Sequence, residues 1–271
     1  MARMIEVHDP ADPRLDDFRD LTIADRRPDR PGGRGLVIAE GVIVVRRLLG
    51  SRYPVRALLG TARRLAELAD DLAGVDAPAY PVAAELMAEV VGFHLNRGVL
   101  AVADRAAPPS VAELARCRAL AVLEGVNDHE NLGGLFRNAA ALGVDGVLLG
   151  PRCADLLYRR SVRVSMGHVL RVPFAVLSSG LADQPEWPAG LDALRGGGRR
   201  LVALTPRSRA VPLAEAGLAG ARVALLLGAE GPGLSEPALT AADEWVRIPM
   251  ASGVDSLNVA TAAAIAFAAL R

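Results

Sequence analysis

The chain has 271 residues, of which 51% are hydrophobic and only 4% aromatic, and its 31 basic side chains balance its 31 acidic ones. This apolar content excludes an intrinsically disordered chain, because enough surface can be buried to offset the entropy of ordering. The late apolar run at 259–270 is too short to cross a bilayer, and the N-terminus lacks the hydrophobic segment of a secretory signal, so we expect a cytoplasmic protein.

The first 105 residues predict a small α/β domain. Strands are expected at 36–38, 55–59 and 98–103, and helices at 41–49, 62–72 and 83–90. The segment 106–110, which contains two consecutive prolines, has the composition of a linker. We therefore expect one domain over residues 1–105 and a second over residues 119–271.

The second half alternates more regularly between strands and helices. Its expected helices lie at 133–142 and 257–270, and its expected strands at 119–123, 146–149, 174–177, 200–204, 223–227 and 244–248. Strands joined through helices pair in parallel, which predicts an open α/β sheet. The last helix is apolar almost all round, which indicates burial on more than one side, including against a second subunit.

Several kinds of site are disfavoured by the composition. Cys117 and Cys153 are too few and too far apart for a disulfide framework or a thiolate metal site, and the four histidines lack metal-binding spacing. We expect reduced thiols and no metal. The chain contains no lysine, which removes the P-loop, and it has no G-x-G-x-x-G dinucleotide fingerprint.

Three polar loops follow predicted strands of the second half, where open α/β sheets usually place ligands. The first, at 127–139, holds Asn131 and Arg137, which could also be a helix N-cap and a solvated cation. The second, at 227–234, has three glycines around Glu230. The third, at 248–260, holds Ser256, a candidate N-cap, and Asn258, whose amide needs partners if it is buried.

Taken together, these loops resemble motifs 1, 2 and 3 of the SpoU (TrmH) family of RNA ribose 2′-O-methyltransferases, within the SPOUT class. Motif 1, N-x-G-x-x-x-R, is matched by Asn131, Gly133 and Arg137, and motif 2, G-x-E-x-x-G, by Gly228, Glu230 and Gly233. Motif 3 is matched by the run Ile248, Pro249 and Met250 followed by Ser256, Leu257, Asn258 and Val259. A further family segment, R-x-S-x-G, occurs at Arg163, Ser165 and Gly167.

The resemblance implies a fold and a reaction. The fold is a C-terminal SPOUT α/β domain with a deep trefoil knot, preceded by a smaller ribosomal-protein-like α/β domain that binds the RNA substrate. The reaction is S-adenosylmethionine-dependent methylation of a ribose 2′-hydroxyl in structured RNA, with ribosomal RNA favoured over transfer RNA. The implied cofactor pocket is formed near Gly228, Ile248 and Leu257, with Met250 lining it.

The resemblance also implies roles for the motif side chains. For Arg137 the resemblance implies removal of the hydroxyl proton. Because a guanidinium is a poor base, we instead expect Arg137 to bind the adjacent phosphate and position the hydroxyl. Asn131, Glu230, Ser256 and Asn258 are then expected to hold that arrangement.

RNA and a second copy of the chain are the expected macromolecular partners, and two arginine-rich segments could contact the RNA. The net charge of 137–171 is positive, and Arg26, Arg27, Arg30 and Arg34 form a second cluster that could follow an RNA backbone or remain a solvated arm. A homodimer through the C-terminal domain would bring Arg137 to the neighbouring pocket. The alternatives are a non-catalytic RNA-binding protein of the same fold and, disfavoured by the missing fingerprint, a nucleotide-dependent oxidoreductase.

Overall fold

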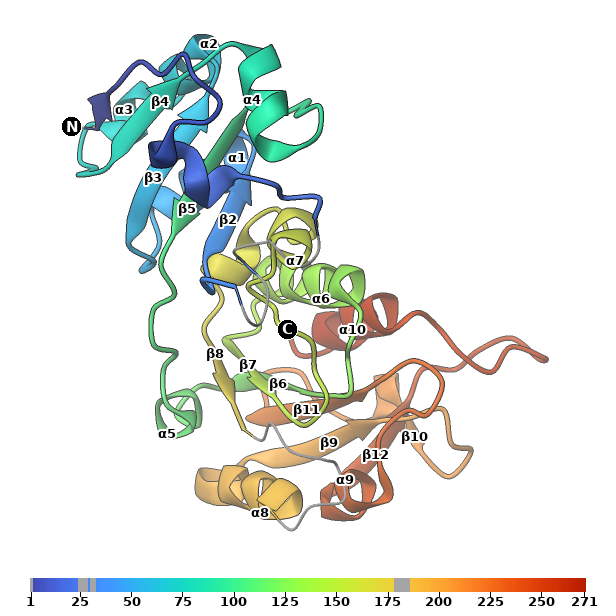
Figure 1. Ribbon diagram of the computed structural model, residues 1–271. Coiled ribbons are helices and arrows are strands. Elements are labelled where there is room, and N and C mark those ends of the chain that lie inside the picture. The colour runs from blue at the N-terminus through green and yellow to red at the C-terminus, as the bar shows by residue number, and fades with distance from the viewer. Residues whose placement is uncertain (1, 24–28, 30–32, 178–185) are drawn as a thin grey trace. The chain divides into compact units, whose positions relative to one another are not determined.

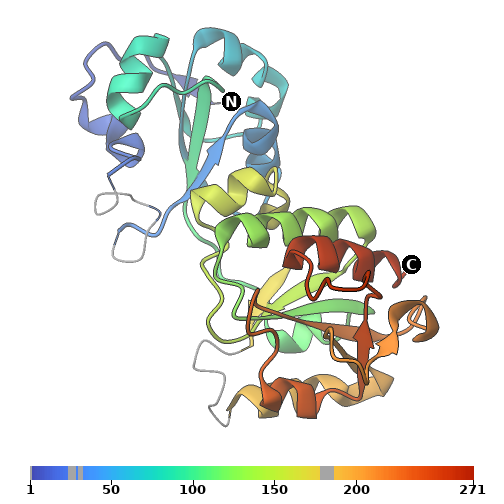
Figure 2. The same cartoon turned by 90° about the vertical axis from the view of Figure 1, so that its right-hand side faces the viewer.

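The computed structural model describes the chain except for residues 1, 24–28, 30–32 and 178–185 (Figures 1 and 2). It divides the chain into two compact units. Unit 1 comprises Met1–Ala107 and Leu157–Arg171, and unit 2 comprises Pro108–Leu156 and Val172–Arg271. The chain therefore passes between the units three times, whereas a single linker at 106–110 was expected.

Unit 1 is built on a five-stranded mixed sheet in the order β1-β4-β3-β5-β2. β5 is antiparallel to both β2 and β3, and the other neighbours are parallel. The strands are β1 (Arg3–Met4), β2 (Val37–Glu40), β3 (Val55–Gly60), β4 (Pro78–Pro81) and β5 (Val99–Ala103). The helices are η1 (Pro13–Phe18), α1 (Val42–Leu49), α2 (Ala62–Ala66), α3 (Ala69–Leu72) and α4 (Ala84–Val91).

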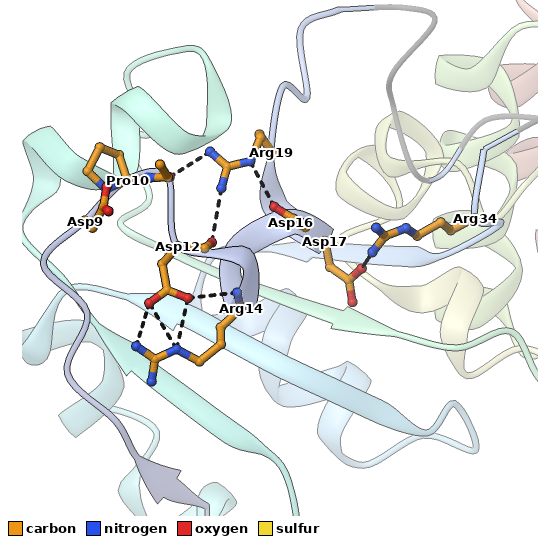
Figure 3. Close-up of polar contacts among 9 residues, drawn as sticks. Asp9, Pro10, Asp12, Arg14, Asp16, Asp17, Arg19 and Arg34 are labelled. Carbon is orange, nitrogen blue, oxygen red and sulfur yellow. Dashed lines mark hydrogen bonds and ion pairs between the residues drawn. The ribbon is translucent and has the colours of Figure 1, made fainter.

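The N-terminal segment of unit 1 is held by ion pairs around η1 (Figure 3). Asp12 caps this short helix by accepting a hydrogen bond from the backbone N–H of Arg14. Its carboxylate also accepts hydrogen bonds from the Arg14 guanidinium. These hydrogen bonds lower the pKa of Asp12 to about 2. Leu15 and Phe18 of the helix are buried in the core of unit 1, so the segment is part of the folded unit.

The segment Leu157–Arg171 contains α7 (Arg159–Val164) and η3 (His168–Leu170) and packs with unit 1. The Arg159 guanidinium forms an ion pair of 3.1 Å with the buried Glu40 and stacks over the Phe93 ring. The backbone N–H of Arg159 donates to the buried Asp29 at 2.9 Å. These contacts are distant in sequence, which is why the segment was assigned to the second domain from the sequence alone.

The R-x-S-x-G segment has a packing role at the end of α7. Ser165 is fully buried and donates to the carbonyl of Val162 at 3.0 Å. Gly167 has φ +83°, and a Cβ there would lie 3.3 Å from the side chains of Arg47 and Val44. Arg47 donates to the carbonyl of Met166. Gly167 is therefore explained by close packing against α1, and Ser165 by a hydrogen bond within its own buried turn.

Unit 2 is built on a seven-stranded sheet in the order β10-β12-β9-β11-β6-β7-β8, and every neighbouring pair is parallel. Its strands are β6 (Ala119–Glu124), β7 (Gly146–Leu149), β8 (Phe174–Val176), β9 (Arg200–Leu204), β10 (Val211–Pro212), β11 (Val223–Gly228) and β12 (Glu244–Arg247). The central strands are almost entirely buried, as expected for a parallel sheet covered on both faces. This confirms the predicted open parallel sheet.

Helices cover both faces of this sheet (Figures 1 and 2). α6 (His129–Leu142) and α10 (Val259–Ala268) lie on one face, and α8 (Glu186–Asp192) and α9 (Glu236–Ala241) on the other. α6 and α10 approach so closely that a Cβ on Gly134 would lie 3.0 Å from the Cβ of Ala260. Asn138 also donates to the carbonyl of Ala260 at 2.8 Å. The remaining short helices are α5 (Val111–Leu114), η4 (Ala193–Gly198) and η5 (Leu213–Glu215).

Several predicted elements differ from the structure. The helix expected at 62–72 is divided into α2 and α3, and the last helix begins at Val259 rather than at residue 257. α10 also buries one face only: Val259, Ala263 and Phe267 are buried while Ile265 is exposed. Among the described residues, no helix is long and apolar enough to span a membrane.

Candidate active site

A cavity of about 390 Å³ lies in unit 2, where the loops that follow β9, β11 and β12 meet. Its volume falls in the range of about 300–1,000 Å³ that is common for small-molecule sites. The residues that line it come from the three loops and the start of α10: Leu204, Thr205, Pro206, Leu227, Gly228, Ala229, Glu230, Gly231, Gly233, Ile248, Met250, Ser256, Leu257, Asn258, Val259 and Ala262. All four predicted cofactor-binding residues, Gly228, Ile248, Met250 and Leu257, are among them.

The loop after β11 folds back on itself to form one wall of this cavity. Gly231 and Gly233 have φ +83° and +69°, and the N–H of Gly233 donates to the carbonyl of Ala229 at 3.0 Å. A Cβ on Gly228 would overlap the backbone of Gly233 and Leu234. Glycine at 228 is therefore required by the loop itself.

Side chains from the three motif segments meet at the N-terminus of α10. The Asn258 side chain donates at 2.7 Å both to Oδ1 of Asn131 and to Oε1 of Glu230. The same Glu230 oxygen accepts from the backbone N–H of Val259 at 3.3 Å. The structure thus joins Asn131, Glu230 and Asn258, which we name the Asn258 network, although the three residues are up to 127 positions apart.

Both predicted N-caps were assigned to the wrong residue. Asp128, and not Asn131, caps α6 by accepting from the N–H groups of Glu130 and Asn131. Asn258, and not Ser256, caps α10. Asn258 Oδ1 accepts from the two backbone N–H groups of the first turn of α10, at 3.0 and 3.1 Å.

Ser256 lies in the exposed loop before α10 and lines the cavity. Its hydroxyl donates to Asp255 at 3.3 Å, and it is not a member of the Asn258 network. The structure therefore separates Ser256 from the other three polar residues that were expected to act with it.

Arg137 lies on the third turn of α6 and is exposed. It is six residues beyond Asn131, about 9 Å further along the helix axis and about 120° around it. Asn131 and Arg137 therefore do not lie at the same end of the helix. Arg137 forms neither a hydrogen bond nor an ion pair with any residue that the structure describes, so its guanidinium donors face solvent.

Sequence reasoning missed the loop after β9. Leu204, Thr205 and Pro206 line the cavity, and Thr205 is buried. The signal was available, because this loop follows a buried strand whose carboxyl end lies at the same edge of the parallel sheet as the glycine-rich loop.

Neither cysteine has the properties of a nucleophile. Both Cys117 and Cys153 are free thiols, and burial raises the pKa of Cys153 to about 11. Burial and the nearby Asp145 also raise the pKa of the Cys117 thiol. Among the residues placed by the structure, no group of three or more histidine, cysteine or carboxylate side chains could hold a metal ion.

The arginines of the two expected basic clusters are divided between the units, and some of them are already paired with carboxylates. Arg137 and Arg152 of the 137–171 segment lie in unit 2, whereas Arg159, Arg160, Arg163 and Arg171 lie in unit 1. Arg159 is committed to its ion pair with Glu40. Arg26, Arg27 and Arg30 lie outside the described residues, and Arg34 forms an ion pair with Asp17 (Figure 3).

The chemistry of the cavity suits a ligand with both apolar and polar parts. Ile248, Met250 and Leu257 supply apolar side chains, and the glycine-rich loop supplies exposed backbone groups. Glu230 is the one carboxylate among the lining residues. This donor set fits a nucleoside-containing cofactor that is recognised mainly through the main chain, and it does not resemble a phosphate-binding or metal site.

A parallel α/β sheet with a cavity between loops at its carboxyl edge defines a protein that acts on a small-molecule ligand. Residues 118–268 match the model of the SpoU rRNA methylase family, and the chain belongs to this family. It is 61% identical over 265 residues to a protein of Mycobacterium tuberculosis named as a tRNA/rRNA methyltransferase, covering 97% of this chain and 90% of that one. A similarly named protein of Synechocystis is 33% identical over 202 residues, or 73% and 69% of the two chains.

Solved structures support the same assignment. The SpoU methyltransferase AviRb from Streptomyces viridochromogenes aligns with a TM-score of 0.76 at 26% identity, covering 94% of this chain and 95% of that one. A structure described as an RNA 2′-O ribose methyltransferase aligns with a TM-score of 0.71 at 25% identity, over 98% and 97% of the chains. AviRb has also been solved in complex with AdoMet, at a TM-score of 0.75 and 24% identity over 95% and 96% of the chains.

Proposed function

We propose that this protein transfers a methyl group from S-adenosylmethionine to a ribose 2′-hydroxyl of structured RNA, with ribosomal RNA as the favoured substrate. The observation that carries the proposal is the Asn258 network at the rim of the cavity. It joins one polar residue from each of the three motifs, with Asn258 bonded to both Asn131 and Glu230 at 2.7 Å.

S-adenosylmethionine is the cofactor of this RNA methyltransferase, and when bound it supplies an electrophilic methyl group on a sulfonium. Gly228, Ile248 and Leu257 would hold it, with Met250 against its apolar part. Glu230 and Asn258 keep the glycine-rich loop and the start of α10 together, which fixes two walls of the cavity.

Arg137 is the residue proposed to act on the RNA. Methyl transfer requires the 2′-hydroxyl oxygen to lose its proton as it forms the new bond to carbon, and a guanidinium is a poor acceptor of that proton. A planar guanidinium can instead grip a phosphate with two parallel hydrogen bonds. Arg137 therefore binds the phosphate beside the target ribose and aligns the hydroxyl. Asn131, Glu230 and Asn258 maintain the site, and Ser256 lines the cavity.

We further propose that unit 1 is the RNA-binding domain and that the loops around the cavity belong to a deep trefoil knot. The family resemblance supports both assignments, together with a cytoplasmic location. In unit 1, the docked α7 carries Arg163, which is exposed. That residue adds a cation to the same unit that would select the RNA.

A homodimer through unit 2 is also proposed. Apolar side chains remain exposed on α10 and the loop before it: Ile265 is 41% exposed, Val254 51% and Leu257 38%. A second copy that covers these residues would remove apolar surface from water. In such a dimer, Arg137 of one protomer serves the cavity of its partner.

The substitution Arg137→Ala tests the proposed role. We expect it to lower methyl transfer to bulk ribosomal RNA by at least about a hundredfold, because positioned groups typically contribute that much. The affinity for S-adenosylmethionine, measured by calorimetry, should stay within about twofold of the wild type, since Arg137 does not line the cavity. Arg137→Lys keeps the charge without the planar fork, and partial activity at most is expected.

Two results would contradict this assignment. Wild-type turnover by Arg137→Ala would remove its role in the reaction. Binding of RNA and S-adenosylmethionine by the wild-type protein without any transfer would favour the alternative, a non-catalytic RNA-binding protein of the same fold.

A further inference from the structure

An aromatic ring surrounded by arginines lies on unit 2, outside the site described above. Trp245 is half-buried on β12, and Arg247 projects from the same face of that strand because it is two residues further on. Arg207 and Arg209 belong to the exposed loop between β9 and β10. We refer to Trp245, Arg207, Arg209 and Arg247 as the Trp245 cluster.

The ring of Trp245 is fixed and carries a stacked cation. Its indole N–H donates to the carbonyl of Leu239 at 2.8 Å, which anchors it against the end of α9. The guanidinium carbon of Arg209 lies 3.5 Å from the ring centroid, and that of Arg207 lies 5.1 Å away. Stacking on the ring holds the Arg209 guanidinium in place while its N–H edge stays free to donate.

The loop that carries these arginines is tied to the sheet at both ends. The N–H of Thr205 donates to the carbonyl of Val246 at 2.9 Å, and that of Ala210 donates to the carbonyl of Arg207 at 3.0 Å. Arg247 donates through Nε to the carbonyl of Ala210 at 3.0 Å. The cations are therefore presented by a rigid frame, which lowers the entropy lost when they bind a ligand.

Glu236 offsets part of the charge of the three arginines. It forms an ion pair with Arg207, and its carboxyl pKa is lowered by Arg207 and also by the positive charge of Arg209. Neither Arg209 nor Arg247 forms an ion pair in the part of the chain that the structure describes. The cluster therefore keeps an excess of positive charge on an exposed surface.

The cluster borders the cofactor cavity along two segments of chain. Arg207 directly follows Pro206, which lines the cavity, and Trp245 precedes the lining residue Ile248 by three positions. Since consecutive Cα atoms are about 3.8 Å apart, the Cα of Arg209 lies at most about 11 Å from that of Pro206. A polyanion whose reacting group enters the cavity has its neighbouring phosphates within reach of this surface.

We propose that the Trp245 cluster is a second RNA-contact surface, at which Arg209, held over the Trp245 ring, and Arg247 bind backbone phosphates of the substrate near the methylated nucleotide. The inference rests on the proposed function, because it takes RNA to be the substrate. Contacts of this kind position the nucleic acid and do not read its sequence.

The test compares the full-length wild-type protein with Arg209→Ala in binding purified bulk ribosomal RNA over a range of salt concentrations. Loss of one phosphate contact should weaken binding about threefold to tenfold near 0.1 M salt and reduce the salt slope by about one. Arg209→Lys, which keeps the charge without the planar stacking, should be intermediate. Affinity for S-adenosylmethionine should not change.

Arg116→Ala is the matched control, because Arg116 is an exposed arginine of the same unit that lies before the amino end of β6, whereas the Trp245 cluster lies toward the carboxyl ends of β9 and β12. It should leave the salt slope unchanged. If Arg209→Ala matches the wild type in affinity and slope, the proposal is wrong, and a simultaneous loss of binding to polyglutamate would assign the cluster to an acidic protein partner. If the wild-type protein itself binds no RNA, the proposed function fails first.

Discussion

Asn258 combines two roles at the scale of single residues: it caps α10 and it joins Asn131 to Glu230. Asn258→Ala removes both. We expect a loss of about 1 kcal/mol in the free energy of unfolding, the usual effect of deleting an N-cap. Weaker binding of S-adenosylmethionine should accompany it, because two walls of the cavity are no longer tied together. Urea unfolding and calorimetry measure the two effects.

Ser256→Ala is the control for this substitution. Ser256 is two residues away in the same exposed loop, and among the residues that the structure places its hydroxyl bonds only to Asp255. The free energy of unfolding should change by less than about 0.5 kcal/mol. An Asn258→Ala variant as stable as Ser256→Ala, with wild-type cofactor affinity, would show that the network is not needed to hold the cavity.

The motif residues could be predicted from sequence, but their local roles could not. Any of several polar residues before an apolar run can cap a helix, and only the backbone decides which one does. Asp128 and Asn258 therefore took the places expected for Asn131 and Ser256. The requirement for glycine at 228 also depends on a loop that folds back from five residues further on.

At the scale of elements, the loop after β11 gives the sharpest prediction. Gly228→Ala places a methyl group into the backbone of Gly233 and Leu234, so the loop must move. We expect binding of S-adenosylmethionine to fall by at least about tenfold, with a loss of about 1–3 kcal/mol in stability from overpacking. Calorimetry and thermal unfolding report the two quantities.

Gly74→Ala is the matched glycine substitution, since nothing lies within 4 Å of a Cβ at that position. It should leave both quantities unchanged. Wild-type cofactor affinity in Gly228→Ala would mean that the folded-back loop does not shape the binding site.

Buried strands of unit 2 were predictable because parallel strands covered on both faces are continuous apolar runs. The runs at 146–149 and 200–204 agree with β7 and β9 at both ends. β1 and β10 have two residues each, too few for a periodic signal, and β4 begins and ends with proline. The docking of α7 depends on contacts with β2 and α1 more than 100 residues earlier, which local patterns do not encode.

At the scale of the whole molecule, the triple crossing between the units affects truncation. A chain that starts at Val111 loses Glu40 and the rest of the surface against which 157–171 packs, yet keeps the apolar side chains of Val162, Val169 and Leu170. Exposing each such side chain to water lowers the free energy of unfolding by about 1.5–3 kcal/mol. We therefore expect the truncated protein to aggregate or to unfold at a clearly lower temperature, as measured by sedimentation and thermal unfolding.

The same truncation with residues 157–171 replaced by a flexible glycine–serine linker is the informative comparison. It should be monodisperse and should bind S-adenosylmethionine, because the cavity is formed by unit 2 alone. If the simple truncation is already monodisperse with full cofactor affinity, the segment does not depend on unit 1 for its fold.

Whether the protein methylates ribose 2′-hydroxyls of RNA is decided by mapping ribose methylation across total RNA. Cells with the protein, cells without it and cells that carry only Arg137→Ala would be compared. We predict at least one 2′-O-methylated nucleotide, in ribosomal RNA, that is present only with the wild-type protein. Identical ribose methylation in all three would contradict the proposed activity, and a lost methyl group on a base would contradict the ribose assignment.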